Sequence, residues 1–331
     1  MKKIAFSFIG VILCMLMLFS CVGCSSNEEI YTGGTLGIQQ SDIGAFSESL
    51  GLESDNNKKP TQNQTNNQNN NQTNNQTNNQ NNNQTGDQSG KQTDAQVTFK
   101  VRFSSYNIYH GGNNKDLTKI ADNIKNNKLD IIGFEEVDNN TNRSGKVNQV
   151  KKLSELTGLK YYHFFKAINH DGGEYGLAIL SKYPIESSNK INLSSPSSEQ
   201  RILAHSVINV NGEKINFFVT HLSYDEESSN KGKDYREKQF NEIANEFAKH
   251  ENFVLAGDFN TRYLDEYSVI KNSKLVNTKE APQITYPDGR SPLDNLVYST
   301  SVWTFDKINV VTNSYSDHYM IHSEATYTKK K

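Results

Sequence analysis

The sequence predicts an α/β protein in which two β-sheets pack face to face with helices on their outer sides. From residue 97 onward, short runs of β-branched and aromatic residues outnumber the stretches with helical spacing, which indicates sheets rather than a helical bundle. The helical stretches lie between some of these runs, as in domains where helices cover packed sheets. Asn211-Gly212 separates two of the runs and is typical of a two-residue hairpin turn.

Each element follows from the local pattern of apolar residues. Alternating or short continuous apolar runs predict strands at 97–108, 129–134, 161–165, 177–181, 202–210, 215–220, 253–255, 296–298, 308–311 and 322–327. Apolar residues at helical spacing predict helices at 117–124, 147–156 and 235–248. Strands are therefore in the majority, as two packed sheets require.

The N-terminus has the features of a bacterial export signal with a lipid attachment site. Lys2 and Lys3 precede an apolar stretch at 4–19, which is too short for an ordinary membrane span. Cys21-Val22-Gly23-Cys24 resembles a lipobox, in which a small residue precedes the cysteine that is acylated. We expect residues 1–23 to be removed and Cys24 to carry the lipid, with Cys21 as the alternative site. An uncleaved anchor or an ordinary cleaved signal is also compatible with this stretch.

Residues 24–95 are expected to be a disordered tether. Residues 62–85 contain only Asn, Gln and Thr, so they have no apolar surface whose burial would offset the entropy of ordering. An aggregating or adhesive segment is the alternative interpretation. The protein is thus expected outside the cytoplasm, held at the bacterial cell membrane by its lipid.

Residues 96–331 remain as one domain, whose length is usual for an α/β sandwich. All three cysteines lie in the leader, which excludes disulfides and cysteine metal sites from this domain. The chain has 35 basic and 37 acidic side chains. A general polyanion-binding surface is therefore not indicated, and contact with nucleic acid has to come from local patches. We expect the domain to be a monomer.

Polar motifs occur at the ends of the predicted strands and predict phosphate-ester chemistry. Hydrolysis of a phosphodiester requires a cation on the phosphate, an oriented water and a group that stabilises the leaving oxygen. Glu136 and Asn107 offer the hard oxygen ligands that Mg²⁺ prefers, with Mn²⁺ or Ca²⁺ as alternatives. Asp258 and Asn260 lie two residues apart, on the same side of an expected extended segment, and suit the positioning of water and phosphate.

Two histidines complete this set. His318 and His221 are candidates to contact the phosphate or to transfer protons, and Asp294 is the expected partner that fixes the tautomer of His318 and favours its cation. Taken singly, each histidine is more often structural, the Gly-Asp-Phe-Asn segment is compatible with a turn, and Glu135-Glu136 is compatible with a solvated strand end. The combination in one domain favours a shared site.

Residues 97–327 resemble the endonuclease/exonuclease/phosphatase superfamily, which includes DNase I, AP endonucleases, sphingomyelinases and inositol polyphosphate 5-phosphatases. The matching segments are Asn107-Ile108, Glu136-Val137-Asp138, 141–145, 175–181, Thr220-His221-Leu222, 257–260 and Ser316-Asp317-His318. The resemblance implies a four-layered α/β sandwich with the site at one end of the paired sheets. It also implies the same roles for the residues named above.

The resemblance adds further residues to the site. It implies that Asp317 lies next to the metal and that Glu174 is the carboxylate partner of His221. Glu135 departs from the family, which usually has Gln there, and adds a carboxylate beside the metal ligand. Arg143 and Arg201 are candidates to contact substrate phosphate, or alternatively surface ion pairs.

Together these features predict a surface-anchored, metal-dependent phosphodiesterase, with extracellular DNA as the favoured substrate. A sphingomyelinase-like enzyme and an inositol-phosphate phosphatase are alternatives within the superfamily. The first needs an exposed aromatic hairpin, for which 298–305 with Trp303 is the candidate. An inactive surface binding module is the alternative from another class.

Overall fold

The computed structural model describes residues 96–331 except 114, 226–230 and 313–314. The predicted signal, the lipid site at Cys24 and the tether lie outside the described residues. The chain divides into two units, Met1–Thr85 and Gly86–Lys331, and the second contains all the described elements. Among the described helices, none combines the length and the hydrophobicity needed to span a bilayer.

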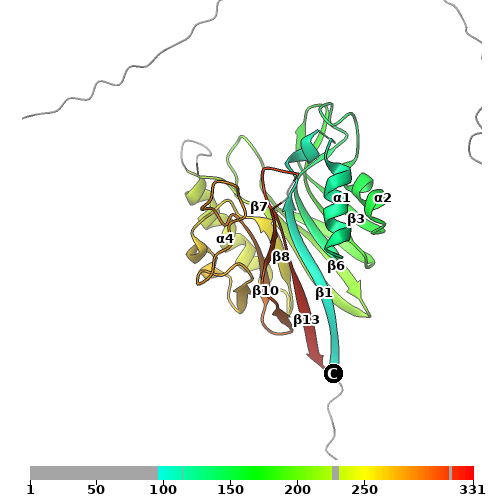
Figure 1. Cartoon of the computed structure of the whole chain (residues 1–331). Helices are drawn as coiled ribbons and strands as arrows, with labels where there is room; N and C mark the ends of the chain where they lie inside the picture. Colours follow the sequence, from blue (N-terminus) through cyan, green and yellow to red (C-terminus); the bar gives the residue numbers. More distant parts are fainter. Residues whose placement is uncertain (1–95, 114, 226–230, 313–314) are drawn as a thin grey trace, which may run out of the picture. The chain divides into compact units, whose positions relative to one another are not determined.

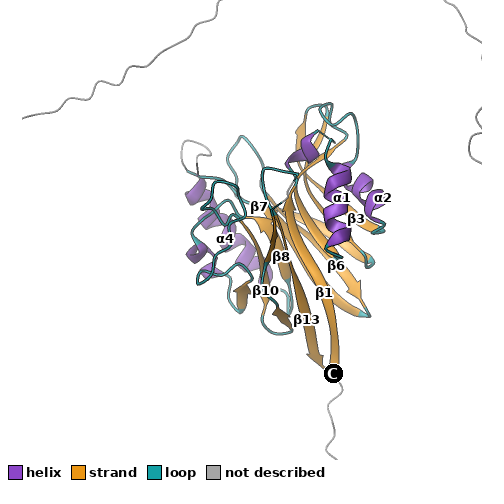
Figure 2. Ribbon diagram, in the orientation of Figure 1, coloured by secondary structure: helices purple, strands orange, loops and turns teal. Residues whose placement is uncertain are grey.

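The described part contains two mixed β-sheets (Figures 1 and 2). In the first sheet the order is β11-β13-β1-β2-β4-β3, and β12 also pairs with β13. Its strands are β1 Gln96–Asn107, β2 Ile131–Asn139, β3 Tyr161–His170, β4 Gly173–Ser181, β11 Trp303–Phe305, β12 Asn309–Val311 and β13 Met320–Lys330. In the second sheet the order is β5-β6-β7-β8-β10-β9. Its strands are β5 Ile185–Asn192, β6 Ile202–Val210, β7 Glu213–His221, β8 Val254–Asp258, β9 Ser273–Leu275 and β10 Asp294–Ser299.

Helices cover the outer face of each sheet (Figure 2). They are α1 Leu117–Asn126, α2 Gln149–Thr157 and α4 Gly232–Phe247, with 3₁₀ turns η1 Tyr109–Gly112 and η2 Leu264–Val269. One apolar core, which includes Phe103 and Phe217, lies between the sheets. A second lies beneath α1 and α2, and a third lies beneath α4. These three cores separate four layers, so the predicted four-layered α/β sandwich is confirmed.

The helices form where the sequence supplies an apolar face and end signals. α1 buries Leu117, Ile120, Ala121 and Ile124, the spacing of one helix face. α2 is capped at its N-terminus by Asn148, whose side chain accepts a hydrogen bond from the backbone N–H of Lys151, and it ends before Gly158, which has φ 78°. These helices match the predicted positions to within a few residues.

Two parallel strand pairs set the position of the polar motifs. β1 and β2 are parallel and connected through α1, and β7 and β8 are parallel and connected through α4. Because parallel neighbours end at the same edge, Asn107 and Glu135 lie side by side in the first sheet, as do His221 and Asp258 in the second. β10 is antiparallel to β8 and begins with Asp294 opposite Asp258.

The structure also differs from the predicted elements. The sequence pattern identified β6 at its observed bounds, and the Asn211-Gly212 hairpin is confirmed by φ values of 54° and 91°. It missed β5, which is a largely exposed edge strand, and the three-residue strands β9 and β11. The suggestion that Trp303 faces a membrane is wrong, because the residue is 3% exposed and packs against Phe103.

Candidate active site

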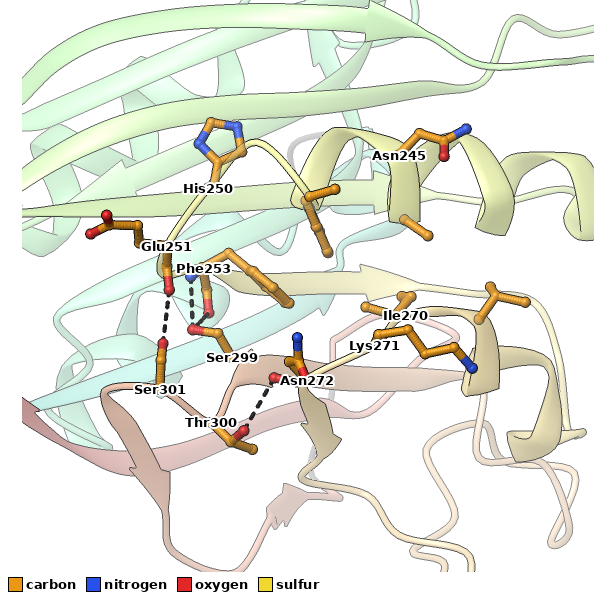
Figure 3. Close-up of a pocket in the computed structure, with 14 residues that line it drawn as sticks. Asn245, His250, Glu251, Phe253, Ile270, Lys271, Asn272, Ser299, Thr300 and Ser301 are labelled. Carbon is orange, nitrogen blue, oxygen red and sulfur yellow. Dashed lines mark hydrogen bonds between the residues drawn. The ribbon is translucent and has the colours of Figure 1, made fainter.

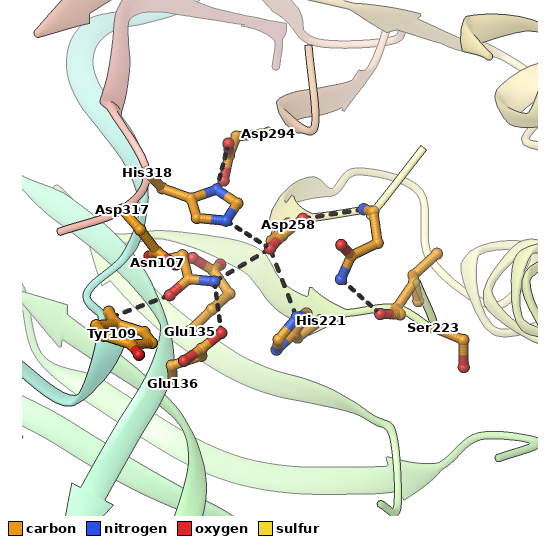
Figure 4. Close-up of polar contacts among 12 residues, drawn as sticks. Asn107, Tyr109, Glu135, Glu136, His221, Ser223, Asp258, Asp294, Asp317 and His318 are labelled. Carbon is orange, nitrogen blue, oxygen red and sulfur yellow. Dashed lines mark hydrogen bonds and ion pairs between the residues drawn. The ribbon is translucent and has the colours of Figure 1, made fainter. Parts of the chain in front are cut away.

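Asn107, at the end of β1, connects the two sheets through its buried amide (Figure 4). Its Nδ2 donates hydrogen bonds to Glu136 Oε1 and to Asp258 Oδ2, both at 3.1 Å. Its Oδ1 accepts a hydrogen bond from the backbone N–H of Tyr109 at 3.1 Å. The amide is therefore held in one orientation between a carboxylate from each sheet.

Glu136 lies on a β-bulge. The pairing of β2 with β4 shifts register between Phe134 and Val137, and Glu136 has φ 58°. A bulge re-aims a side chain out of the regular alternation. Burial raises the pKa of Glu136 to about 7, the hydrogen bond from Asn107 opposes this, and the charge of Asp317 adds to the increase.

Glu135, the departure from the family pattern, points into the interior. It is fully buried, and its Oε1 accepts a hydrogen bond from Ser105 Oγ at 3.0 Å. Burial, and then the charges of Asp294 and Asp258, raise its pKa well above the ordinary value. The protonated form is thereby favoured, and a protonated Glu has the same shape as Gln and, like it, offers one donor and one acceptor group. Glu135 is therefore expected to add less negative charge beside the metal ligand Glu136 than an ionised carboxylate would.

Asp258, His318 and Asp294 form a buried chain of polar contacts (Figure 4). His318 Nδ1 lies 2.9 Å from Asp294 Oδ2, and its Nε2 lies 3.4 Å from Asp258 Oδ2. The backbone of Asp294 is fixed by Thr285, whose Oγ1 accepts the hydrogen bond from the Asp294 N–H. The structure thus places Asp294 where the sequence predicts a partner for His318.

The electrostatics of the two histidines differ. Burial alone would lower the pKa of His318, but the charges of Asp294 and Asp258 outweigh it and raise the pKa well above the ordinary value. His221 Nε2 lies 3.5 Å from Asp258 Oδ2, yet burial, with repulsion from Arg201 and His318, lowers its pKa well below the ordinary value. At neutral pH the site therefore contains a cationic His318 and a neutral His221.

Asp258 is the shared partner of both imidazoles. Burial raises its pKa to about 6, the charge of His318 opposes the increase, and Asp294 adds to it. Its Oδ1 accepts a hydrogen bond from the backbone N–H of Asn260 at 2.9 Å. The expectation of an extended segment at 258–260 is wrong, since β8 ends at Asp258 and Asn260 has φ 51°. The side-chain amide of Asn260 donates to Leu222 O at 3.0 Å.

Ser316 is a positioning residue to which the sequence pattern alone gave no role. Its Oγ donates to Asn107 O at 2.7 Å and accepts from the backbone N–H of His318 at 3.3 Å. The same hydroxyl lies 3.2 Å from Oδ1 of Asp317, which is half-buried beside Glu136. The first residue of the Ser-Asp-His motif thereby connects the other two residues to β1. Its position in this motif was the sequence feature from which its role could have been predicted.

Two predicted residues have other partners. Glu174 accepts a hydrogen bond from Asn139 and pairs with Lys166 at 3.3 Å; no contact with His221 is found within the described residues. The sequence placed Glu174 only by its order in the chain, and β4 directs it toward β2 and β3 instead. Arg143 makes two hydrogen bonds of 2.8 Å to the buried Asp138, so much of its charge is neutralised there.

Arg201 lies close to the site. It is 3% exposed, pairs with Glu199 at 2.9 Å and, with Tyr175 and His221, lines a narrow pocket. A buried guanidinium beside a site histidine is well placed to face an anion. Arg201 thus lines the pocket beside His221, and Arg143 lies 5.6 Å from the ring of Tyr175 in the same lining, within reach of the charge of Glu136.

Comparison with known proteins gives the family. The model of the endonuclease/exonuclease/phosphatase family matches residues 104–318. The chain belongs to the endonuclease/exonuclease/phosphatase family. Enzymes of this family are phosphoric ester hydrolases that depend on a divalent metal. A search of curated proteins found no match.

Solved structures of the endonuclease/exonuclease/phosphatase family share the fold. A family protein from Bacteroides thetaiotaomicron has a TM-score of 0.55 at 17% identity, covering 70% of this chain and 99% of that one. The mannosyl-6-phosphatase Bt3783 of the same organism has a TM-score of 0.53 at 18% identity, covering 68% and 99%. Truncated TDP2 from Caenorhabditis elegans has a TM-score of 0.53 at 22% identity, covering 70% and 98%. At these identities the likeness is one of fold.

The donor set fits the divalent metal on which the family depends. The charges of Asp317 and Asp258 add to the raised pKa of Glu136, and a bound cation relieves such repulsion. Ligand atoms of Asp258, Asp294 and His318 also lie within 4.8 Å of one another. Both ring nitrogens of His318 already face carboxylates, which leaves the oxygen donors of Glu136, Asn107 and Asp317 as the better ligands for a hard cation.

A cavity of about 690 Å³ lies elsewhere (Figure 3). It is lined by the end of α4 and by residues that precede β8, whereas Asp258 is at the other end of β8. Two hydroxyl groups in its lining already make hydrogen bonds to backbone carbonyls: Ser301 donates to Glu251 O, and Thr300 donates to Asn272 O. The family chemistry therefore belongs to the edge shown in Figure 4.

Proposed function

We propose that this protein is a metal-dependent phosphodiesterase that hydrolyses DNA outside the cell, anchored to the bacterial membrane through a lipid on Cys24. The observation that carries the proposal is the convergence of Asn107, Glu136, Asp258 and His318 at one sheet edge. Such a site offers an acid, a base and oxygen ligands within hydrogen-bond reach of one another, as hydrolysis of a phosphate ester requires.

Glu136, Asn107 and Asp317 would hold the metal, with Mg²⁺ as the favoured ion. When bound, the ion supplies positive charge that neutralises the phosphate and the developing charge of the reaction. The Asn107 amide keeps the Glu136 carboxylate oriented through the 3.1 Å hydrogen bond. Because the same amide also bonds Asp258, its removal would both weaken metal binding and displace Asp258.

The chain's own groups divide the proton transfers. Asp258, whose pKa is about 6, is mostly ionised at neutral pH and orients the attacking water and accepts its proton. His318 keeps its proton through Asp294, and its Nε2–H, which faces Asp258 Oδ2 at 3.4 Å, is shared with a phosphoryl oxygen when substrate binds and stabilises the charge that develops there. Neutral His221 contacts Asp258 and helps to hold the carboxylate in place.

Arg201 and Asn260 would position the substrate. Arg201 faces the narrow pocket beside His221 and is suited to a phosphate next to the one that is cleaved. Asn260 acts through its turn, because its backbone N–H orients Asp258 and its side chain fixes the segment after β7. Arg143 and Glu174 serve the neighbouring β2–β4 edge.

DNA is favoured over lipid and inositol phosphate on the character of the surface. In the described residues, the exposed large hydrophobic side chains are all tyrosines, whereas a lipid-active enzyme would expose Trp, Phe or Leu to enter a membrane. Arg143 and Arg201 are both paired with carboxylates, so the strongly basic pocket that an inositol polyphosphate requires is not formed by them. An exported and anchored nuclease is consistent with the predicted leader.

The test compares three substrates. The purified protein is incubated with plasmid DNA, sphingomyelin vesicles and inositol phosphates, each with Mg²⁺ or with EDTA, alongside His318→Ala and the exposed control His163→Ala. We expect cleavage of DNA with Mg²⁺ only, loss in His318→Ala and no change in His163→Ala. Cleavage of lipid or inositol phosphate alone would refute the nuclease proposal. Cleavage of none of the three, and of no single-stranded oligonucleotide, would favour an inactive binding module.

The lipid anchor has a separate test. In cells that are fed a labelled fatty acid, we expect label on the wild-type protein and its loss in Cys24→Ser. Label that persists in Cys24→Ser and disappears in Cys21→Ser would assign the lipid to the alternative site.

A further inference from the structure

Tyrosines are the exposed large hydrophobic side chains of the described residues. They are Tyr109, Tyr161, Tyr162, Tyr224 and Tyr263. Two of them lie together at the start of β3. The other three follow the strands that deliver the site residues, which makes them candidates for contact with whatever occupies the site.

Tyr109 lies on the first-sheet side of the site. It comes two residues after Asn107, and its backbone N–H donates to Asn107 Oδ1 at 3.1 Å. Its side chain is 47% exposed, and Figure 4 shows it beside Asn107 and Glu136. The backbone of Tyr109 has the unusual φ of 44° and makes this hydrogen bond, and its ring lies 4.4 Å from that of His110.

Tyr224 and Tyr263 lie on the second-sheet side. Tyr224 comes two residues after Leu222, whose N–H donates to Asp258 O and whose carbonyl accepts from the Asn260 amide. Tyr263 comes three residues after Asn260. Because consecutive Cα atoms are about 3.8 Å apart, neither tyrosine Cα lies more than about 11 Å from these anchors. The two side chains are 45% and 55% exposed.

A buried arginine fixes both of these segments. Arg236 of α4 donates to Ser223 O at 2.8 Å, next to Tyr224, and to Glu266 at 2.9 Å, in η2 after Tyr263. The side chain of Arg236 is fully buried. The tyrosines are therefore presented from supported segments, while much of each ring remains exposed.

The chemistry of these rings identifies their ligand. Half-exposed tyrosine rings offer flat faces, and stacking of a base on an aromatic ring contributes about 1–3 kcal/mol per base with little dependence on sequence. Tyr109 follows a site strand of the first sheet, and Tyr224 and Tyr263 follow site strands of the second. Rings supplied from both sheets would suit a substrate that continues in both directions from the phosphate, as a nucleic-acid strand does. In a duplex the base faces are covered by neighbouring bases, so the rings could stack only on an unpaired strand.

We propose that Tyr109, Tyr224 and Tyr263, which we call the tyrosine rim, stack against unpaired bases on both sides of the bound phosphate. The enzyme then prefers single-stranded nucleic acid to duplex. This inference rests on the phosphodiesterase function proposed above and adds the substrate form to it.

The test measures cleavage and binding by the full chain. The substrates are an end-labelled single strand and the same strand annealed to its complement, both with Mg²⁺. We expect kcat/KM for the single strand to exceed that for the duplex at least tenfold. We expect each Tyr→Ala change in the rim to lower it about tenfold, and Tyr→Phe, which keeps the ring, to lower it less than twofold. Tyr161→Ala and Tyr162→Ala are matched controls that leave it unchanged.

Binding separates stacking from folding. In an inactive His318→Ala background, each rim Tyr→Ala is expected to weaken the affinity for the single strand, measured by fluorescence anisotropy, with an unchanged melting temperature. Cleavage of both strand forms with equal efficiency, or an equal effect of Tyr→Ala and Tyr→Phe, would overturn the rim proposal and leave the nuclease proposal intact. Failure of the wild-type protein to cleave either form would refute the nuclease function itself. Rim variants that weaken only the hydrolysis of a sugar phosphate would assign the rings to sugars and overturn the proposal.

Discussion

At the scale of single residues, the environment of each buried imidazole decides its charge. His318 lies between two carboxylates, Asp294 and Asp258, which raise its pKa. His221 shares Asp258 at 3.5 Å, but burial, with repulsion from Arg201 and His318, lowers its pKa. The same side chain therefore serves as a cation at one position and as a neutral group at the other. Such a division of charge states is common where acid and base roles must be separated at one pH.

Removal of the carboxylate behind His318 should change both rate and pH dependence. Asp294 helps to raise the pKa of His318, so the active cation is lost as pH rises through that raised pKa. In Asp294→Asn the pKa falls, and the alkaline limb of kcat against pH should move to lower pH, with kcat about 10²- to 10⁴-fold lower at pH 8. The exposed Asp306→Asn is the control. An alkaline limb in the same place would contradict the role given to Asp294.

The isosteric change Glu135→Gln should be nearly silent. Burial and two carboxylates favour the protonated form of Glu135, which Gln reproduces in shape and in donor and acceptor groups. We expect kcat/KM with DNA and Mg²⁺ within about threefold of wild type, whereas Glu136→Gln, which removes a metal ligand, should lower it at least 10²-fold. A loss of similar size in both variants would mean that Glu135 acts as a charged ligand.

The sequence predicted which residues gather at the site better than what each one contacts. Asn107 and Asp258 end β1 and β8, and His318 lies two residues before β13, positions that can be inferred from local pattern. Glu136 instead lies on a bulge inside β2, which the local pattern does not predict. The turn at Asn260 and the partners of Glu174 depend on register and on segments far away in the chain. The charge states of the site residues depend on their burial in the folded protein, which the local sequence pattern does not reveal.

At the scale of elements, buried central strands were more readily predicted than edges. β6 and β13 have apolar residues that face a core, so their alternation is visible in the sequence. β5 is mostly polar and lies at the edge of its sheet, and β9 and β11 have three residues each. Such strands are stabilised by pairing with neighbours rather than by their own pattern, and the sequence signal was correspondingly weak.

Arg236 is the element-scale feature whose loss should be most informative. It joins α4 to the segments after β7 and β8 through Ser223 O, Asp225 and Glu266. Replacement by Met leaves a buried acceptor and a partly buried carboxylate without a partner, so we expect the free energy of unfolding to fall by about 3 kcal/mol. Urea unfolding provides the measurement, and the exposed Lys238→Met on the same helix is the control.

The same replacement should act on function through position. Tyr224 and Tyr263 lie in the two segments that Arg236 holds. Arg236→Met should therefore raise KM for a single strand more than it lowers kcat. An unchanged KM at a temperature where the variant is folded would show that the two segments keep their place without Arg236.

At the scale of the whole molecule, the sandwich concentrates acidic groups at one end. Carboxylates from both sheets meet there: Glu135 and Glu136 from β2, Asp258 from β8 and Asp294 from β10. Burial opposes the ionisation of Glu135, Glu136 and Asp258. The metal is therefore expected to contribute to folding as well as to catalysis, and the apparent stability should depend on pH and metal together.

The sign of this dependence follows from the raised pKa values. Glu136 has a pKa of about 7 when folded and an ordinary value of 4.5, so the folded state holds the proton more tightly and the free energy of unfolding falls as pH rises from about 4.5 to about 7. Asp258, at about 6 against 3.8, acts in the same direction. At about 1.4 kcal/mol per pH unit, Glu136 alone contributes on the order of 3 kcal/mol. His221, with its lowered pKa, acts in the opposite direction as pH falls below its ordinary value of 6.5.

A comparison of the wild type with Glu136→Gln isolates this effect, since the contribution of His221 is present in both. In EDTA, the melting temperature of the wild type should fall more between pH 5 and pH 8 than that of Glu136→Gln. Mg²⁺ should raise the wild-type melting temperature at pH 8, where Glu136 is ionised, and have little effect at pH 5, where protons occupy the ligands. An equal effect of Mg²⁺ at both pH values, or in both proteins, would mean that the ion binds away from Glu136 and that this end of the sandwich is not the metal site.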